Sequence, residues 1–90
     1  MNTPRHFETA LREASVIRTM LGDLDRTIQL LDVDIATEEQ RVRVFDVSHP
    51  TYPILARTLA TRRDNLKDTI VALEQRLSTV TARLAVPIAA

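Results

Sequence analysis

Apolar residues recur at alternating spacings of three and four through the first half of the chain. The residues of this series are Phe7, Ala10, Ala14, Ile17, Leu21, Leu24, Ile28, Leu31, Ile35, Val42 and Phe45. Glu38 interrupts it. A heptad series of this length is typical of a helix that packs along its whole length against another helix. Because Thr3 can cap a helix and Pro4 suits its first turn, we expect a helix over residues 4–45.

A second heptad series follows a cluster of helix-breaking residues. Its members are Ala56, Leu59, Leu66, Ile70, Leu73, Leu77, Val80 and Leu84. Arg63 interrupts this series as Glu38 interrupts the first. Pro50 and Pro53 each disfavour helical geometry in the residue before them. We therefore expect a bend over residues 46–52 and a second helix over residues 53–86.

The two series can pack on each other in an antiparallel hairpin, in which residues at one level have numbers with a constant sum. With a sum of about 101, every apolar level meets an apolar partner, and Glu38 meets Arg63. A slipped register would place each of these charges against leucine, so the pair would fix the register. In the alternative interpretation, both side chains reach solvent from a narrow two-helix interface. The predicted fold is all-α, an antiparallel coiled-coil hairpin.

Several apolar residues lie outside these two series or beyond their overlap. They are Val16, Met20, Leu30, Val33 and Val71 outside the series, and Phe7, Ala10 and Leu11 beyond the end of the second helix. A second hairpin packed alongside would cover them. We therefore predict a homodimer that forms a four-helix bundle. The alternative is that scattered exposed apolar residues are ordinary protein surface and need no partner.

Composition and charge add constraints on class and location. Ninety residues form at most one domain, and 3% aromatic residues with a single glycine favour long helices. Cysteine is absent, which removes disulfides and thiolate chemistry. No apolar run approaches the roughly 18 residues of a membrane span, so we expect a soluble protein that does not insert into membranes. The missing cysteines fit a reducing cytoplasm, which is the expected location. Residues 1–50 carry a net charge of about −3 and residues 51–90 about +3, which suits arms that pack on each other.

Residue patterns that carry catalysis or ligand binding are missing from the sequence. His6 and His49 are its only histidines, and they fall at opposite ends of the predicted hairpin, too far apart to share a metal ion. There is no glycine-rich phosphate loop and no nucleophile with a neighbouring base. We therefore expect no enzymatic activity, no catalytic residue, and no metal or cofactor.

Six basic residues of the second helix are candidates for nucleic-acid binding. They are Arg57, Arg62, Arg63, Lys67, Arg76 and Arg83. Small dimeric helical hairpins can bind RNA, as the plasmid Rop-type bundles do. Here three acidic residues interleave with the basic ones and stacking aromatics are missing, which favours a solvated helix face over a nucleic-acid surface. A small RNA-binding helical bundle is the alternative function.

The bend and the start of the second helix share a longer motif. Its residues are Asp46, His49, Tyr52, Pro53, Ala56 and the run Arg62-Arg63-Asp64-Asn65-Leu66. At the same spacing, these residues resemble the central bend of alphaproteobacterial flagellar export proteins of the FliJ type. The resemblance covers residues 46–66. It implies a non-enzymatic coiled-coil adaptor that works in type III flagellar export and contacts the export ATPase or the export gate.

Four residues of this motif are the candidate partner surface. Asp64 and Asn65 point outward from the second helix and are the residues least explained by packing. Tyr52 sets the restart of the helix, and His49 can bond the turn. We therefore expect His49, Tyr52, Asp64 and Asn65 to contact a protein partner. The alternative is that the whole motif is a recurrent structural turn.

Overall fold

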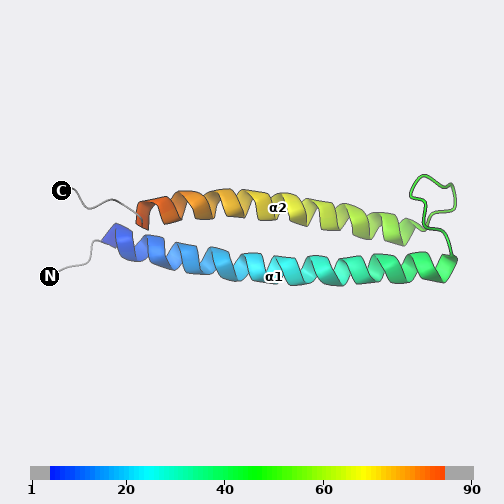
Figure 1. Cartoon of the computed structure of the whole chain (residues 1–90), viewed down its shortest axis with the longest axis horizontal. Coiled ribbons are helices and arrows are strands. Elements are labelled where there is room, and N and C mark those ends of the chain that lie inside the picture. The colour runs from blue at the N-terminus through cyan, green and yellow to red at the C-terminus, as the bar shows by residue number, and fades with distance from the viewer. Residues whose placement is uncertain (1–4, 85–90) are drawn as a thin grey trace.

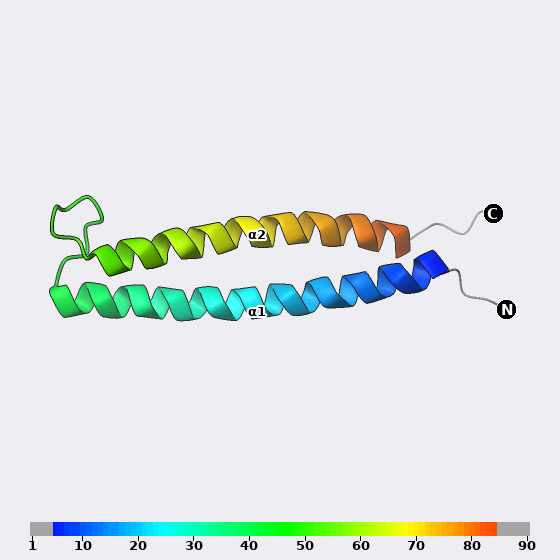
Figure 2. The ribbon, with the colours of Figure 1, turned by 180° about the vertical axis from the view of Figure 1, so that it is seen from behind.

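The structure is a computed structural model that describes residues 5–84 and contains two helices joined by a loop (Figure 1). Helix α1 spans Arg5–Val42 and helix α2 spans Ile54–Leu84. They run antiparallel, so the start of α1 and the end of α2 lie at one end and the loop at the other (Figures 1 and 2). The hairpin measures 65 × 18 × 15 Å. The prediction of an all-α fold of two helices packed on each other is confirmed.

Helix α1 ends three residues earlier than the heptad pattern predicts. Its last residue is Val42, and Arg43 follows with a left-handed backbone, at a φ of 61°. The backbone N–H of Arg43 donates to the carbonyl oxygen of Glu39 over 2.8 Å, which satisfies one of the free carbonyls at the helix end. Phe45 therefore lies in the loop. The expected helix start at Pro4 and the expected end at residue 86 lie outside the described residues.

The register differs from the predicted one by about one heptad. Ala14 and Val80 share a buried cluster and their numbers add to 94, while the ion-paired Asp32 and Arg63 add to 95, against the expected 101. A shift of seven residues superimposes one heptad series on itself, so nearly every apolar level is matched again. The observed register brings the end of α2 further along α1, where two alanines at the open end gain cover.

Two buried clusters form the core of the hairpin. The cluster at the open end consists of Ala10, Ala14, Ile17 and Val80, with Leu21, Leu73, Leu77 and Leu84 packed against it. The cluster at the bend end consists of Ile35, Tyr52 and Ala56, with Val44, Leu59 and Ala60 around it. Ala10 is 3% exposed, so the expectation that it extends beyond the second helix is wrong. Its cover comes from the hairpin itself.

Ile28 and Leu31 are also buried between the two clusters, but several apolar side chains remain on the surface of the single chain. The exposed residues include Val16, Met20, Leu30, Val33 and Val71. The sequence predicts this, because they lie outside the two heptad series that form the seam between the helices. Within residues 5–84, neither helix has a stretch that is both long and apolar enough to cross a membrane.

Candidate functional site

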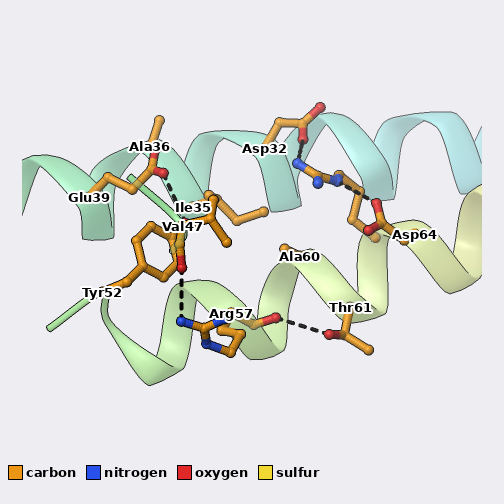
Figure 3. A pocket seen from close by; sticks show the side chains of 11 residues that line it. Asp32, Ile35, Ala36, Glu39, Val47, Tyr52, Arg57, Ala60, Thr61 and Asp64 are labelled. Atoms are coloured by element: carbon orange, nitrogen blue, oxygen red, sulfur yellow. Dashed lines mark hydrogen bonds and ion pairs between the residues drawn. The ribbon is translucent and has the colours of Figure 1, made fainter. Parts of the chain in front are cut away.

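A half-open groove of about 430 Å³ lies at the bend end, between the two helices and the loop (Figure 3). Its lining residues are Asp32, Ile35, Ala36, Glu39, Val47, Tyr52, Arg57, Ala60, Thr61, Arg63 and Asp64. Both helices and the loop contribute, so the groove exists only when the hairpin is closed. The aliphatic residues supply its apolar part, and the charged residues stand around them.

Tyr52 anchors the loop at the inner end of this groove. Its side chain is 5% exposed, and its hydroxyl donates to Oε2 of Glu39 over 2.9 Å. Burial first, and then the bond to Glu39, raise the pKa of Tyr52 above its ordinary value. The Arg57 guanidinium lies 5.4 Å from the centre of the ring and donates to the carbonyl oxygen of Val47 over 3.0 Å. Tyr52 therefore ties the loop to both helices.

Arg63 stands at the rim of the groove and bridges two carboxylates. Its Nη1 donates to Asp32 and its Nε to Asp64, each over 3.1 Å. These two bonds raise the pKa of Arg63. Glu38 instead accepts from Nη2 and Nε of Arg41, at 2.5 and 3.0 Å, and this bond lowers the pKa of Glu38.

The predicted Glu38–Arg63 register pair is therefore wrong for this structure. The shift by one heptad moves Arg63 to the level of Leu31 and moves Glu38 to the level of Ala56. Each charged side chain then turns out of the seam toward a partner beside it. A long side chain can do this because its apolar stem stays against the other helix while its charged end turns sideways to a partner; the side chains of Arg63 and Glu38 are 25% and 13% exposed.

Replacing Arg63 with leucine tests this correction. The ion pairs of Arg63 involve carboxylates that are 51% and 62% exposed, and such pairs contribute only about 0–1 kcal/mol each. A leucine would add apolar area to the seam. We expect the free energy of unfolding to stay unchanged or to rise by about 1 kcal/mol in urea titrations followed by circular dichroism. A loss above about 1 kcal/mol would show that Arg63 holds the register.

Side-chain bonds inside the loop specify its shape. Oδ1 of Asp46 accepts from the backbone N–H of Ser48 over 3.0 Å and from its hydroxyl over 2.7 Å. These bonds lower the pKa of Asp46. Nδ1 of His49 accepts from the backbone N–H of Thr51 over 3.1 Å and lies 2.8 Å from its Oγ1. The prediction that His49 bonds the turn is confirmed.

The four predicted partner residues do not gather at one place. Tyr52 and Asp64 line the groove, but Tyr52 is buried and acts as an anchor, so the expectation of a Tyr52 exposed to a partner is wrong. His49 lies in the exposed loop, outside the groove lining. Asn65 is exposed on α2 and also lies outside that lining.

Three charged groove residues, Asp32, Glu39 and Arg57, were missing from the predicted site. Asp32 and Glu39 lie seven residues apart on α1, a spacing that places them on one side of the helix. Arg57 follows Tyr52 by five residues. The spacing on α1 is a usable signal, but it points to a shared groove only when the register between the helices is known.

The groove combines an apolar lining with five charged side chains. Three carboxylates, Asp32, Glu39 and Asp64, face two guanidinium groups, which leaves a net charge of −1. All five charged groups already have a partner: Arg63 bonds Asp32 and Asp64, Glu39 accepts from the Tyr52 hydroxyl, and Arg57 donates to the carbonyl oxygen of Val47. Across residues 5–84, no group of three histidine, cysteine or acidic side chains is arranged to hold a metal ion.

Comparisons with protein-family models, with curated proteins and with solved structures gave no match to this chain. Its class therefore rests on its own geometry. Fold and groove define a two-helix antiparallel hairpin whose bend end carries a small mixed apolar and charged groove.

Proposed function

We propose that this chain is a non-enzymatic coiled-coil interaction protein that binds a polypeptide partner at the bend end. The observation that carries this proposal is the half-open groove, with aliphatic residues in its lining and charges around them. Binding sites commonly combine apolar contact area with a few placed polar groups. Val47, which lines the groove, is 56% exposed and extends the apolar area onto the loop.

The shape of the chain also favours a protein partner. Its transverse dimensions are 18 and 15 Å, about the width of two packed helices, which leaves little depth for enclosing a small substrate. The long sides present a large surface instead. Peptide recognition by helical proteins uses such shallow grooves between helices.

The groove charges define the chemistry of the partner. Arg57 is held by Val47 and the Tyr52 ring, and Arg63 is shared between two carboxylates. A lysine or arginine of the partner would place its aliphatic stem along Ala36 and Ala60 and bring its charge to the carboxylates. We expect a partner segment with a basic residue beside an apolar one.

We propose flagellar type III export, in the cytoplasm, as the setting, with the export ATPase or the export gate as partner. The support is the resemblance of residues 46–66 to the bend of FliJ-type proteins, and three motif residues, Tyr52, Arg63 and Asp64, line the groove. We also propose a homodimer in a four-helix bundle. The exposed apolar side chains along both helices support it, because a second hairpin would remove them from water.

Calorimetry tests the proposal. It measures binding of the purified chain to the purified export ATPase and to the soluble domain of the export gate, both from the same genome. Ala36→Arg places a long side chain in the groove without touching the buried clusters. We expect it to weaken binding at least tenfold, or about 1.4 kcal/mol. Ala82→Arg is the matched control, an exposed helical alanine far from the bend, and should bind like wild type.

The possible results separate the parts of the proposal. Equal binding by wild type and Ala36→Arg would exclude the groove as the site. Absence of binding to both export components would exclude the export setting. Binding to RNA that falls steeply with salt would favour the alternative function of a helical RNA-binding bundle, because phosphate contacts release counterions.

A further inference from the structure

A second heptad series runs along α1 beside the seam. Its residues are Val16, Met20, Asp23, Thr27, Leu30 and Asp34, at alternating spacings of four and three. Val16, Met20 and Leu30 are 53%, 43% and 66% exposed, although a regular heptad spacing places them on one face. The charged members of this outer series of α1 are both acidic.

Helix α2 has a corresponding outer series of different character. Its residues are Arg62, Asn65, Thr69, Ala72, Arg76, Thr79 and Arg83, at alternating spacings of three and four. All charged members are arginine, and the residues between them are small or short. Asn65, which the groove does not explain, belongs to this series.

The two outer series lie on the same flank of the hairpin. Glu13 continues the outer series of α1 at the same spacing, and its carboxylate accepts from Arg76 of the α2 series over 2.8 Å. The Asp32–Arg63 ion pair and the groove belong to the other flank. One flank therefore carries an acidic row with bulky apolar residues beside a basic row with small residues.

We propose that a second copy of this chain covers this flank, with α1 of each copy packed on α2 of the other. This inference rests on the homodimer proposed above and specifies its interface. In the observed register, Val16 lies at the level of Thr79 and Leu30 at the level of Asn65 of α2, while Met20 falls between Ala72 and Arg76. A second α1 laid over α2 at the same level would seat its bulky residues on short ones, as close helix packing requires.

Charge complementarity selects this pairing over its alternative. Between Arg5 and Val42, α1 has eight acidic and five basic residues, and between Ile54 and Leu84, α2 has three acidic and six basic residues. Packing α1 on the α1 of a second copy would oppose two helices of net charge −3. Packing α1 of one copy on α2 of the other brings a helix of net charge −3 against one of net charge +3. It also brings Asp34 of one copy to the level of Arg62 of the other.

The pairing also determines how the two hairpins are oriented. A two-fold axis parallel to the long axis places α1 over α2 and keeps both bends at one end. An axis across the long axis places α1 over α1 and puts the bends at opposite ends. The proposed interface therefore places both copies of the bend-end groove at the same end of the bundle, on its two opposite outer faces.

Distances between spin labels in the dimer test the orientation. The chain has no cysteine, so Gln40→Cys, on the outer side of α1 near the bend, provides one label per copy. With both bends at one end, the two labels should lie within about 30 Å, since packed helices are roughly 8–10 Å apart. With bends at opposite ends they would lie about 50 Å apart, because Gln40 is about 16 residues from the middle of α1.

Thr19→Cys is the matched control for this measurement. It lies near the middle of α1, so either orientation predicts a short distance between its labels. A short distance at both positions supports the proposal. A short distance for Thr19→Cys with a long one for Gln40→Cys overturns the pairing but leaves the dimer. A monomer by light scattering at high concentration overturns both the dimer and the interface.

Charge exchange provides an independent test of which helices meet. We expect the double variant Arg62→Glu/Arg83→Glu to raise the dissociation constant of the dimer at least about thirtyfold, as measured by sedimentation. The double variant Asp23→Lys/Asp34→Lys should do the same, because each change turns ion pairs between the copies into repulsive contacts. An equal mixture of the two double variants should restore the dimer.

Arg18→Glu with Lys67→Glu is the control for charge exchange, because it makes the same change in net charge on the opposite flank. It should dimerise like wild type. Wild-type dimerisation of the Arg62→Glu/Arg83→Glu variant would overturn the proposal. So would failure of the mixture to restore the dimer.

Discussion

Replacing Tyr52 with alanine is expected to lower the free energy of unfolding by about 3 kcal/mol or more, since truncating a buried aromatic costs roughly 3–5 kcal/mol. Tyr52 is 5% exposed and packs with Ile35 and Ala56, and its hydroxyl bonds Glu39. A chain of this size has a total stability of only about 5–13 kcal/mol. Urea unfolding followed by circular dichroism should show the loss, together with loss of helix near the bend.

Two further variants divide this effect into its parts. Tyr52→Phe keeps the ring and removes the hydroxyl, and should cost about 1 kcal/mol, because Glu39 can still reach solvent. Phe45→Ala is the control, since Phe45 is an aromatic residue of the same loop that is 54% exposed. A Tyr52→Ala variant no less stable than Phe45→Ala would contradict the anchoring role.

Alkaline pH should reveal the burial of the Tyr52 hydroxyl, and with it the bond to Glu39, without truncating the ring. Tyr52 is the only tyrosine of the chain, and its pKa in the folded state is raised above the ordinary 10.0. The unfolded chain thus loses the proton first, so the stabilisation is complete below pH 10 and is lost as pH rises through the raised pKa. Wild type should lose stability above pH 10 relative to Tyr52→Phe. Ultraviolet absorbance reports the titration of the phenol directly.

Cysteine pairs should cross-link in one register and fail in the register shifted by one heptad. Ala14→Cys with Val80→Cys joins two residues that are 0% exposed and share a cluster. Leu21→Cys with Val80→Cys joins the pair expected for a sum of about 101. Seven helical residues separate the two positions on α1 by about 10 Å, more than a disulfide spans. We expect near-complete oxidation of the first pair and little of the second.

Oxidation should be carried out at low protein concentration, with disulfides located by mass spectrometry, so that links between copies are recognised. As a control, both cysteine pairs are oxidised in denaturant, where they should react equally well. Preferential cross-linking of Leu21→Cys with Val80→Cys would establish the other register and would return Glu38 and Arg63 to the same level. Removal of either charge would then strand its partner against the seam.

Parts of the candidate site followed from local sequence and parts did not. The bonds of His49 connect residues two positions apart, so the chemistry of the turn alone predicts them. Asp64 was selected as an outward residue next to a seam position, and it does line the groove. Asp32 and Glu39 were missed, because they meet α2 and the loop across the hairpin. Tyr52 was taken as a surface residue, although burial of its ring depends on the path of the loop.

The apolar spacing and the two prolines were sufficient to specify two long helices, an antiparallel hairpin and the place of the bend. These follow from local rules, since helix periodicity and proline geometry act within a few residues. The register was not specified, because a heptad pattern matches itself again after seven residues. The observed register and the burial of Tyr52 arise from packing across the hairpin. Long-range contacts between the helices determine the register, and the register determines where the charged groups of the groove lie.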